Sequence, residues 1–463
     1  MSLLSIALIA FVAPQGPSPA LVDYYSSIRP IMEAKCLHCH ADASVAFSLE
    51  DPERGYDFRA AIANAVAMKR MPPWMAEGGH QRYVNDYSLT KNELSLFAQW
   101  SAAYYPKGEP PKRAKSKSSY KTFRPDIKIA LEGSKGYLPD QVQRDDYHCF
   151  VATWPLAHEA YVTGFGMVPG NARVSHHAII YVAPPRFKET YQSFVEAEGG
   201  EGYKCLGGPI PDRLAEPVQR DAFEKVHPNG VVELSQNQVW LAHWAPGMEG
   251  YELPQDSGIK IQPGSVLIVQ MHYFNGFAPN ERDPGTQLGF RVARSVGKPS
   301  LNWPMSRGEW LHARNNGSLV VPAKGKLTVS DRVPLGGIDG IVAKLSGHEV
   351  SEFDGIELHS ANVHMHLIGE SGRVTLTRSE QSEVLLSVPR YEFGWQRDFF
   401  FSDPKRITRA DLGKAQVDYS CTFSNPGTTP VYGGFGSQEE MCYNFSYISL
   451  VPRENGKREK PRP

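Results

Sequence analysis

The sequence has almost no net charge and few long apolar runs. Its 463 residues carry 49 Lys and Arg against 50 Asp and Glu, a formal net charge of −1. This balance gives no electrostatic attraction for nucleic acid or for an acidic membrane surface. Beyond the first 20 residues no stretch approaches the roughly 18 apolar residues that a membrane span needs. We therefore expect neither a nucleic-acid partner nor a membrane span.

Long amphipathic stretches are also scarce after residue 120, whereas glycine and proline are frequent in the chain, with 41 and 36 residues. This composition favours strands and turns over that part of the sequence. A chain of 463 residues is too long for one ordinary hydrophobic core, so two or three domains are expected.

One apolar run, LLSIALIAFVA, occupies residues 3–13 and is followed by Pro, Gly and Ser up to Ala20. Residues 1–20 are therefore predicted to be a signal peptide, although no Lys or Arg precedes the run. A short membrane-anchoring or buried segment is the alternative. Export would place the protein in a bacterial periplasm or outside the cell.

Cysteines are few: the chain has six, and two of them share one motif. In an exported protein the other four suggest two disulfides, for which three connectivities are open. These four residues are Cys149, Cys205, Cys421 and Cys442.

The motif with the other two cysteines is Cys-Leu-His-Cys-His at residues 36–40. It matches the C-x-x-C-H attachment site of c-type haem. Cys36 and Cys39 would form thioethers to the haem vinyl groups, and His40 would bind the iron. A redox-active or zinc-binding C-x-x-C with an incidental histidine is the alternative.

Helical patterns surround this motif. Residues 21–35 and 57–70 have helical spacing, and a capping box at Thr90 and Glu93 predicts the start of a third helix. A few short helices around a haem form a small cytochrome. We therefore predict an all-α, cytochrome c-like domain over residues 21–105.

The sixth ligand of the iron is expected to be a thioether from downstream of the motif. Met68, Met71 and Met75 are the candidates. Met71 is preferred because the two prolines after it cannot continue a helix and would fix the loop against the haem edge. The stretch also resembles small bacterial cytochrome c modules in which this methionine is axial. Core packing is its alternative role.

The next residues, 106–122, are rich in Pro and Lys and contain almost nothing apolar. This composition predicts a solvated linker. It would allow the haem domain to move relative to the rest of the chain.

Beyond the linker, three histidines lie in strand-like runs. His176 and His177 occur in ARVSHHAIIYV, and His272 closes VLIVQMHYF. Neighbouring strand residues point to opposite faces, so His176 and His177 could share a metal only at a strand end or a bulge. Each signal is weak alone, because a strand histidine is more often structural than a metal ligand.

His364 and His366, in ANVHMHLIG, form a stronger pattern. Strand alternation would put both imidazoles on one face and Val363, Met365 and Leu367 on the other. Two imidazoles on one face make a good metal-binding pair. Outward-facing polar residues are the alternative.

Met441 lies in GSQEEMC, just after a Gly-rich turn. A thioether together with imidazoles suits copper, especially the reduced ion. Taken alone, this methionine would be assigned to the core.

Six motifs occur in the order seen in the copper type II monooxygenases, the peptidylglycine-hydroxylating and dopamine-hydroxylating enzymes. They are DYHCF, YVTGFGMVPGN, VSHHAIIYVAPP, VQMHYFNG, VHMHLIG and GSQEEMC. The chain resembles this family over about residues 145–448. The resemblance implies two successive antiparallel, jelly-roll-like β-sandwiches, over residues 123–298 and 299–455, each contributing one copper site.

Carried over by position, the resemblance gives each site its ligands. His176, His177 and His272 resemble the ligands of the electron-transferring copper. The oxygen-binding, catalytic copper would be held by His364, His366 and Met441. The cysteines beside two of the motifs suggest the disulfides Cys149–Cys205 and Cys421–Cys442.

The remaining histidines match no ligand position. His243 and His148 lie near the motifs and are expected behind the ligands or at the surface. The others with no better claim are His158, His227, His312, His348 and His359.

Three positions depart from the peptide-amidating members of the family. Asn362 stands where those enzymes have an arginine that clamps the peptide carboxylate, and asparagine cannot form that charged fork. Tyr443 and Phe445 stand where they have an asparagine and a tyrosine. Peptide amidation is therefore not expected, and a more apolar or aromatic substrate fits better.

The sequence thus predicts an oxidoreductase, a copper-dependent monooxygenase that hydroxylates a C–H bond of a small organic substrate with O2. The implied cofactors are two copper ions and one covalent haem c, with ascorbate or a cytochrome-type donor, such as a redox partner protein, as reductant. The first alternative is a non-catalytic copper and haem electron-transfer protein. A second keeps the sandwiches but loads zinc or iron, and the Met441 thioether argues against it.

Overall fold

The computed structural model describes residues 21–41, 47–84, 86–111, 123–205, 207–245, 248 and 250–453. The predicted signal peptide, 1–20, and residues 112–122 of the predicted linker lie outside the described residues. The chain divides into two compact units. The helical unit is built from described residues of Met1–Ala43, Phe47–Pro73 and Tyr87–Tyr120; the β unit from those of Trp74–Asp86 and Lys121–Pro463.

The described part of the helical unit contains helices and loops only. A π-helical turn, Tyr24–Ile28, leads into the α-helices α1 Arg29–Lys35, α2 Leu37–His40, α3 Pro52–Asp57, α4 Arg59–Ala67 and α5 Lys91–Ala102. The predicted capping box is present: Thr90 Oγ1 accepts the Glu93 N–H, and the Glu93 carboxylate accepts the Thr90 N–H. Phe97 and Trp100 of α5 are buried in the core of this unit.

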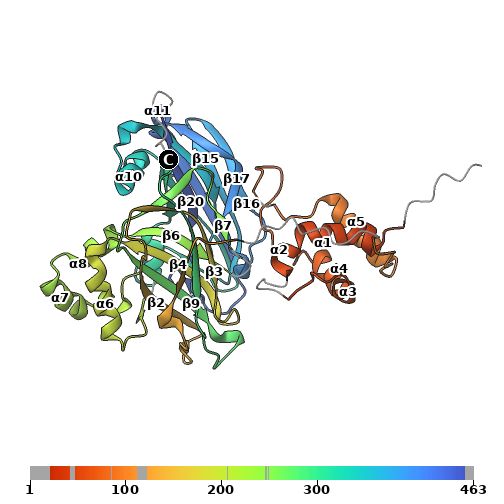
Figure 1. Ribbon diagram of the computed structural model, residues 1–463, viewed down its shortest axis with the longest axis horizontal. Helices are drawn as coiled ribbons and strands as arrows, with labels where there is room; N and C mark the ends of the chain where they lie inside the picture. Colours follow the sequence, from red (N-terminus) through yellow and green to blue (C-terminus); the bar gives the residue numbers. More distant parts are fainter. Residues whose placement is uncertain are drawn as a thin grey trace, which may run out of the picture. The chain divides into compact units, whose positions relative to one another are not determined.

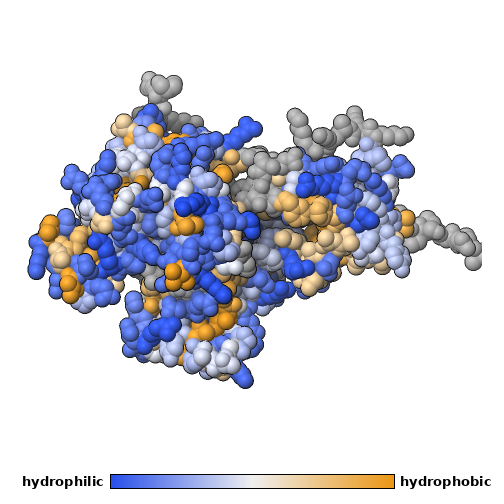
Figure 2. Space-filling model, turned by 90° about the horizontal axis from the view of Figure 1, so that it is seen from below, coloured by the Kyte–Doolittle hydropathy of each residue, from blue (hydrophilic) through white to orange (hydrophobic). Residues whose placement is uncertain are grey.

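Several large apolar side chains of the helical unit are exposed instead of buried. Phe47, Phe58, Met68 and Met71 expose 52%, 38%, 52% and 39% of their surface. Hydrophobic residues also gather on the surface of this unit at the right of Figure 2. Such a patch on a small unit indicates a surface that something else covers.

Residues 74–86 belong to the β unit, although the sequence placed them in the haem domain. Val84 N–H donates to Phe400 O, and Tyr83 Oη donates to Leu385 O, each at 2.8 Å. Tyr83 is 6% exposed. These hydrogen bonds, one from the backbone and one from a side chain, fasten the segment to strands of the C-terminal half.

The described residues of the β unit form four sheets, and most of their strand pairs are antiparallel. The five-stranded sheet has the order β5 Tyr203–Lys204, β2 Asp145–Thr153, β9 Val266–Phe274, β4 Ser175–Ala183 and β6 Val239–Trp244. The four-stranded sheet has the order β13 Gly325–Pro334, β18 Ala415–Asn425, β15 Gly369–Arg378 and β16 Gln381–Val388. A small sheet pairs β12 Val320–Val321 with β19 Val431–Tyr432.

The nine-stranded sheet extends through both halves of the β unit (Figure 1). Its order is β1 Ile127–Ala130, β10 Gln287–Ala293, β3 Ala160–Val168, β8 Ser257–Ile261, β11 Lys298–Met305, β20 Asn444–Pro452, β14 Phe353–Ala361 and β17 Phe399–Thr408, with β7 Tyr251–Glu252 beside β3. The halves join where β8 and β11 pair in parallel. The arrangement agrees with β-sandwiches, but the two share one sheet.

One continuous core fills the space between these layers. Phe165 and Phe290, from the nine-stranded sheet, pack with Val269 and Ile180 of the five-stranded sheet. In the C-terminal half, Ile356 and Leu450 of the shared sheet pack in the same core as Val374, Val417 and Phe423 of the four-stranded sheet. Because both halves share this core, residues at their junction are held in fixed positions.

The strand-and-turn expectation missed several short helices. Three of them, α6 Lys188–Ala197, α7 Pro217–Val226 and α8 Gly230–Gln236, gather at one side of the five-stranded sheet (Figure 1). Tyr191, Phe194 and Val195 make the inner face of α6. Three shorter helices are α9 Ala313–Asn316, α10 Ile338–Ser346 and α11 Arg409–Leu412. All are too short to stand out against their polar surroundings in the sequence.

Two disulfides hold the β unit, and they join the pairs that the resemblance implies. Cys149 bonds to Cys205 beside α6, and Cys421 of β18 bonds to Cys442. These disulfides point to an oxidising compartment. In the described part of the chain, no helix has both the length and the apolar character to cross a membrane.

Candidate metal centres and cavity

His176, His177 and His272 come together on neighbouring strands of the five-stranded sheet. His177 of β4 lies opposite His272 of β9, and the register shifts between Ser175 and His177. This bulge is what lets two consecutive histidines face one point. The His177 Nδ1 atom lies 3.1 Å from His176 Nδ1 and 3.3 Å from His272 Nδ1.

Burial keeps these three imidazoles neutral. It lowers the pKa of His176 to about 4 and those of His177 and His272 well below 6.5. His272 Nε2 is held by the Asp145 carboxylate at 2.7 Å, and its ring stacks on Tyr147 at 4.1 Å. A carboxylate behind a histidine fixes the ring orientation and leaves the other nitrogen for a metal. His176, His177 and His272 thus each offer a ring nitrogen within 4.8 Å of the other two, and together they could hold a metal ion.

His364 and His366 follow the end of β14, which stops at Ala361. The predicted strand does not continue through them; His364 makes only an isolated bridge to Tyr443. The expected alternation holds from residue 363 to 366, because Val363 and Met365 point into the core. Leu367 departs from it and is 46% exposed.

Hydrogen bonds orient both of these imidazoles in the same way. His364 Nδ1 bonds to the Gln396 side-chain oxygen, and His366 Nδ1 lies 3.0 Å from the Glu439 carbonyl oxygen. Each ring thus has Nε2 left for a metal. Burial lowers both pKa values, that of His364 to about 3.

Met441 lines the same cavity as His364 and His366, and its neighbour Glu440 bonds to the backbone of their turn. The Glu440 carboxylate is fully buried and accepts the backbone N–H groups of His366, at 2.9 Å, and Ile368, at 2.8 Å. Burial raises its pKa to about 8. Glu440 therefore ties the turn that carries His366 to the loop that carries Met441, a link that the sequence did not reveal.

The two ligand sets lie close together within the β unit. The His177 and His364 rings are 6.2 Å apart. Phe393 stacks on His176 at 4.3 Å and lies 6.0 Å from His366. The two sets therefore face one another across the junction of the halves.

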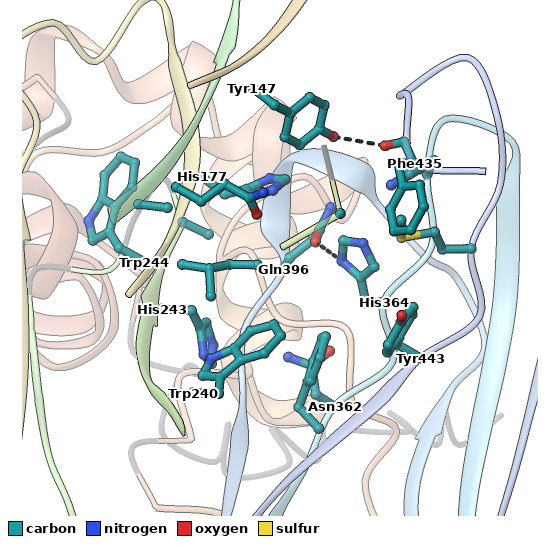
Figure 3. Close-up of a pocket in the computed structure, with 18 of the residues that line it drawn as sticks. Tyr147, His177, Trp240, His243, Trp244, Asn362, His364, Gln396, Phe435 and Tyr443 are labelled. Carbon is teal, nitrogen blue, oxygen red and sulfur yellow. Dashed lines mark hydrogen bonds between the residues drawn. The ribbon is translucent and has the colours of Figure 1, made fainter. Parts of the chain in front are cut away.

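A cavity of about 90 Å³ opens beside both sets (Figure 3). Its lining joins ligands of both sets to aromatic side chains: Tyr147, His177, Tyr181, Trp240, His243, Trp244, Asn362, His364, His366, Phe435, Met441, Tyr443 and Phe445. Cavities with apolar walls and a few polar groups bind small organic molecules.

His243 and Asn362 are the polar groups at one end of this cavity (Figure 3). The sequence placed His243 behind the ligands or at the surface, but it lines the cavity with its Nε2 3.3 Å from Asp398 Oδ2. His148 lies elsewhere, bonded to Tyr137 and Glu201. The one sequence feature that could have suggested this position is that His243 lies close in the sequence to Trp240 and Trp244, which also line the cavity.

The donor atoms of both sets suit copper. Three imidazoles form one set, and the other consists of two imidazoles and a buried thioether that line the same cavity. Imidazole together with thioether suits copper, the reduced ion especially. The residues therefore fit two copper ions.

The residues around His40 fit a covalent haem. His40 Nδ1 lies 2.8 Å from the Phe47 carbonyl oxygen, which leaves Nε2 for iron. Cys36 and Cys39 are outside the disulfides, and burial raises the pKa of Cys36 to about 12. Redox-active C-x-x-C motifs instead lower a thiol pKa. Phe47 also packs against His40 and Phe58, in the exposed apolar patch that a haem would cover.

The three candidate axial methionines lie in different surroundings. Met75 is in the β unit, 7% exposed, and its sulfur accepts the Glu392 N–H. Met68 and Met71 are in the helical unit, with Met68 at the end of α4 and Met71 just beyond it. Met71 thus stays the preferred candidate.

Comparison with known proteins supports the copper interpretation for the C-terminal half. Residues 346–457 match the copper type II ascorbate-dependent monooxygenase family, C-terminal domain. Dopamine beta-hydroxylase of Rattus norvegicus is 22% identical over 320 residues, 66% of this chain and 43% of that protein. The chain therefore spans less than half the length of this relative.

Likeness to solved structures is weak. PNGF-II has a TM-score of 0.28 at 9% identity, over 72% of this chain and 66% of its own. The major capsid protein P2 from Bacteriophage PM2 has a TM-score of 0.24 at 7% identity, over 71% of this chain and 100% of its own.

Proposed function

We propose that this protein is a copper-dependent monooxygenase that hydroxylates a C–H bond of a small apolar or aromatic molecule with O2. The observation that carries the proposal is the convergence of both ligand sets on one aromatic-walled cavity. The C-terminal family match and the dopamine beta-hydroxylase relative support it. Their coverage leaves the activity of the whole chain a proposal.

His176, His177 and His272 would hold one copper ion, and His364, His366 and Met441 the catalytic one. Bound copper supplies one-electron redox chemistry and O2 activation. Asp145 fixes the ring orientation of His272, and Gln396 fixes that of His364. The other nitrogen of each ring would then be available to copper. Such preorganisation avoids rearrangement when the metal binds.

The cavity would hold the substrate beside the second ligand set. Its walls include Trp240, Trp244 and Phe445, which exclude water and offer flat apolar surfaces. A planar molecule between these walls would place its C–H bond next to His364. The small cavity volume limits the substrate to a small organic molecule.

The helical unit would act as a cytochrome c-like electron donor. Cys36 and Cys39 would carry the haem, with His40 and Met71 as its axial ligands. The haem would store one electron, with ascorbate or a redox partner protein as the ultimate reductant. The boundaries of the two sandwiches predicted from the sequence, 123–298 and 299–455, and export to a bacterial periplasm are parts of the same proposal.

A substrate screen tests the function. The copper-loaded full-length protein is incubated with ascorbate, O2 and a set of small aromatic and aliphatic compounds, and products are sought by mass spectrometry. The expected result is a product heavier by one oxygen atom, with O2 uptake that rises with that compound. Copper that is reduced and reoxidised at the same rate with and without every compound would instead indicate the electron-transfer alternative.

A further inference from the structure

Asp398, 36 residues after Asn362 in the sequence, fixes the direction of the Asn362 amide. Asn362 Nδ2 donates to Asp398 Oδ1 at 2.9 Å. An ionised carboxylate only accepts hydrogen bonds, so the amide must turn its nitrogen toward Asp398. The amide oxygen, Oδ1, is thereby turned away from Asp398.

The Oδ1 atom of Asn362 is buried, and within the described residues it has no hydrogen-bond partner. Asn362 is 3% exposed and lines the cavity. A buried polar atom without a partner is costly, and it is found where a ligand or water completes the bond. This end of the cavity therefore presents an acceptor.

His243 adds to the same polar end. Its Nε2 lies 3.3 Å from the second oxygen of Asp398, and its side chain is 13% exposed. This contact does not have hydrogen-bond geometry, so Nε2 is a second buried polar atom at this end without a hydrogen-bond partner among the described residues. No Lys, Arg, Asp or Glu is among the described residues that line the cavity, so the ligand meets polar side chains rather than a carboxylate, ammonium or guanidinium group.

About one aromatic ring separates the polar end of the cavity from the candidate copper ligands. Phe445 lies 6.0 Å from His364 and 6.2 Å from His243, measured between ring centroids. It also packs on Trp240 at 4.6 Å. A single-ring molecule lying along Phe445 would thus reach from the polar end to the metal site.

We propose that Asn362, oriented by Asp398 and assisted by His243, is the specificity-determining residue of the cavity and binds a hydrogen-bond donor on a single-ring aromatic substrate. The donor is a hydroxyl or an amino group on the side of the ring opposite the carbon that reacts. The proposal rests on the proposed function for the identity of the cavity as a substrate site. Asp398 is a positioning residue, because it acts through Asn362.

Three probes of nearly equal shape test the proposal: 4-ethylphenol, 4-ethylaniline and 4-ethyltoluene, whose hydroxyl, amino or methyl group occupies one ring position. Equilibrium dialysis against the copper-loaded full-length protein, without reductant, gives their affinities. We expect at least one donor probe to bind about tenfold more tightly than 4-ethyltoluene, as one buried hydrogen bond provides. The better donor probe identifies the donor as hydroxyl or amine.

Two variants separate recognition from shape. Asn362→Leu should remove the about tenfold preference while 4-ethyltoluene binds as before. Asp398→Asn should weaken binding of the two donor probes only. An amide at position 398 can donate as well as accept, so the Asn362 side-chain amide can flip and its oxygen is no longer held toward the cavity. Asp403 lies in β17, which begins just after Asp398, and forms an exposed ion pair with Arg82. Asp403→Asn is therefore the matched control and should keep the preference.

A protein that binds no donor probe more tightly than 4-ethyltoluene contradicts the proposal. So does an Asn362→Leu variant that weakens all three probes alike, because that result reports only a change of shape. Binding is measured without turnover. A donor preference without any hydroxylated product would therefore overturn the proposed function and leave this inference standing.

Discussion

Asp145 joins the two candidate copper sites. One carboxylate oxygen lies 2.7 Å from His272 Nε2, and the other accepts the Ser437 hydroxyl at 2.6 Å. Ser437 belongs to the loop that leads to Met441. A second hydrogen bond joins β2 to the same loop: Tyr147 Oη donates to Phe435 O at 3.0 Å. Residues of β2 thus support one metal site and fasten the loop of the other.

Replacing Asp145 should weaken one copper site selectively. In Asp145→Asn the His272 ring loses its charged acceptor, so copper affinity at His176, His177 and His272 should fall 10–100-fold. Competition titration with a chelator that binds Cu(I) measures this. Ser437→Ala keeps the bond between Asp145 and His272 and should retain both affinities. Equal losses in the two variants would contradict the assigned role of Asp145.

Copper should bind at two equivalents per chain, and single substitutions should remove the two ions separately. Met441→Leu removes the thioether, so the second site should lose its binding of carbon monoxide as Cu(I) and hydroxylation should stop. His176→Ala should stop turnover but leave carbon monoxide binding intact. Copper analysis and infrared spectroscopy give both readouts. Full activity in Met441→Leu would show that the ligand assignment is wrong.

The sequence contained enough to predict candidate ligands, but not the residues that hold those ligands in place. His364, His366 and Met441 stand in short recognisable motifs, and the bulge before His177 was required by two consecutive histidines sharing a metal. Gln396, Asp398 and Glu440 carry no such motif. Their roles depend on which distant segments the fold brings together. Residue spacing within one segment cannot predict such contacts.

The same limit applies to the fold. The helices of the first unit were predictable from capping and spacing, as at Thr90. The parallel pairing of β8 with β11 and the attachment of residues 74–86 to the β unit were not. Both join segments far apart in the sequence, and they depend on packing of the complete core.

The haem prediction has a direct chemical test. When the protein is produced in cells that mature c-type cytochromes, the haem should remain on the chain after acid–acetone extraction, because thioethers survive that treatment. Cys36→Ala with Cys39→Ala should abolish this covalent haem. Met71→Ala should keep the haem attached and lose the methionine-ligated absorbance. If the wild-type haem is extracted, the helical unit is not a c-type cytochrome.

His359 should make the protein less stable in acid. Burial lowers its pKa to about 4, with Glu357 and Lys298 nearby, whereas in the unfolded chain the pKa is about 6.5. As pH falls below 6.5, only the unfolded state takes up this proton, so stability decreases until about pH 4. Between pH 7 and 5 the loss is about 2 kcal/mol. Denaturant unfolding should show a smaller loss in His359→Gln, and an unchanged pH dependence would contradict the cause.

The most direct test of the account is isotopic. With a compound that gives product in the substrate screen, the reaction is run under ¹⁸O₂ with copper and ascorbate, and the product is analysed by mass spectrometry. The account predicts one ¹⁸O atom in each product molecule, and no product from His364→Ala, which lacks a ligand of the catalytic site. Product that carries oxygen from water, or labelled product formed equally well by His364→Ala, would contradict it.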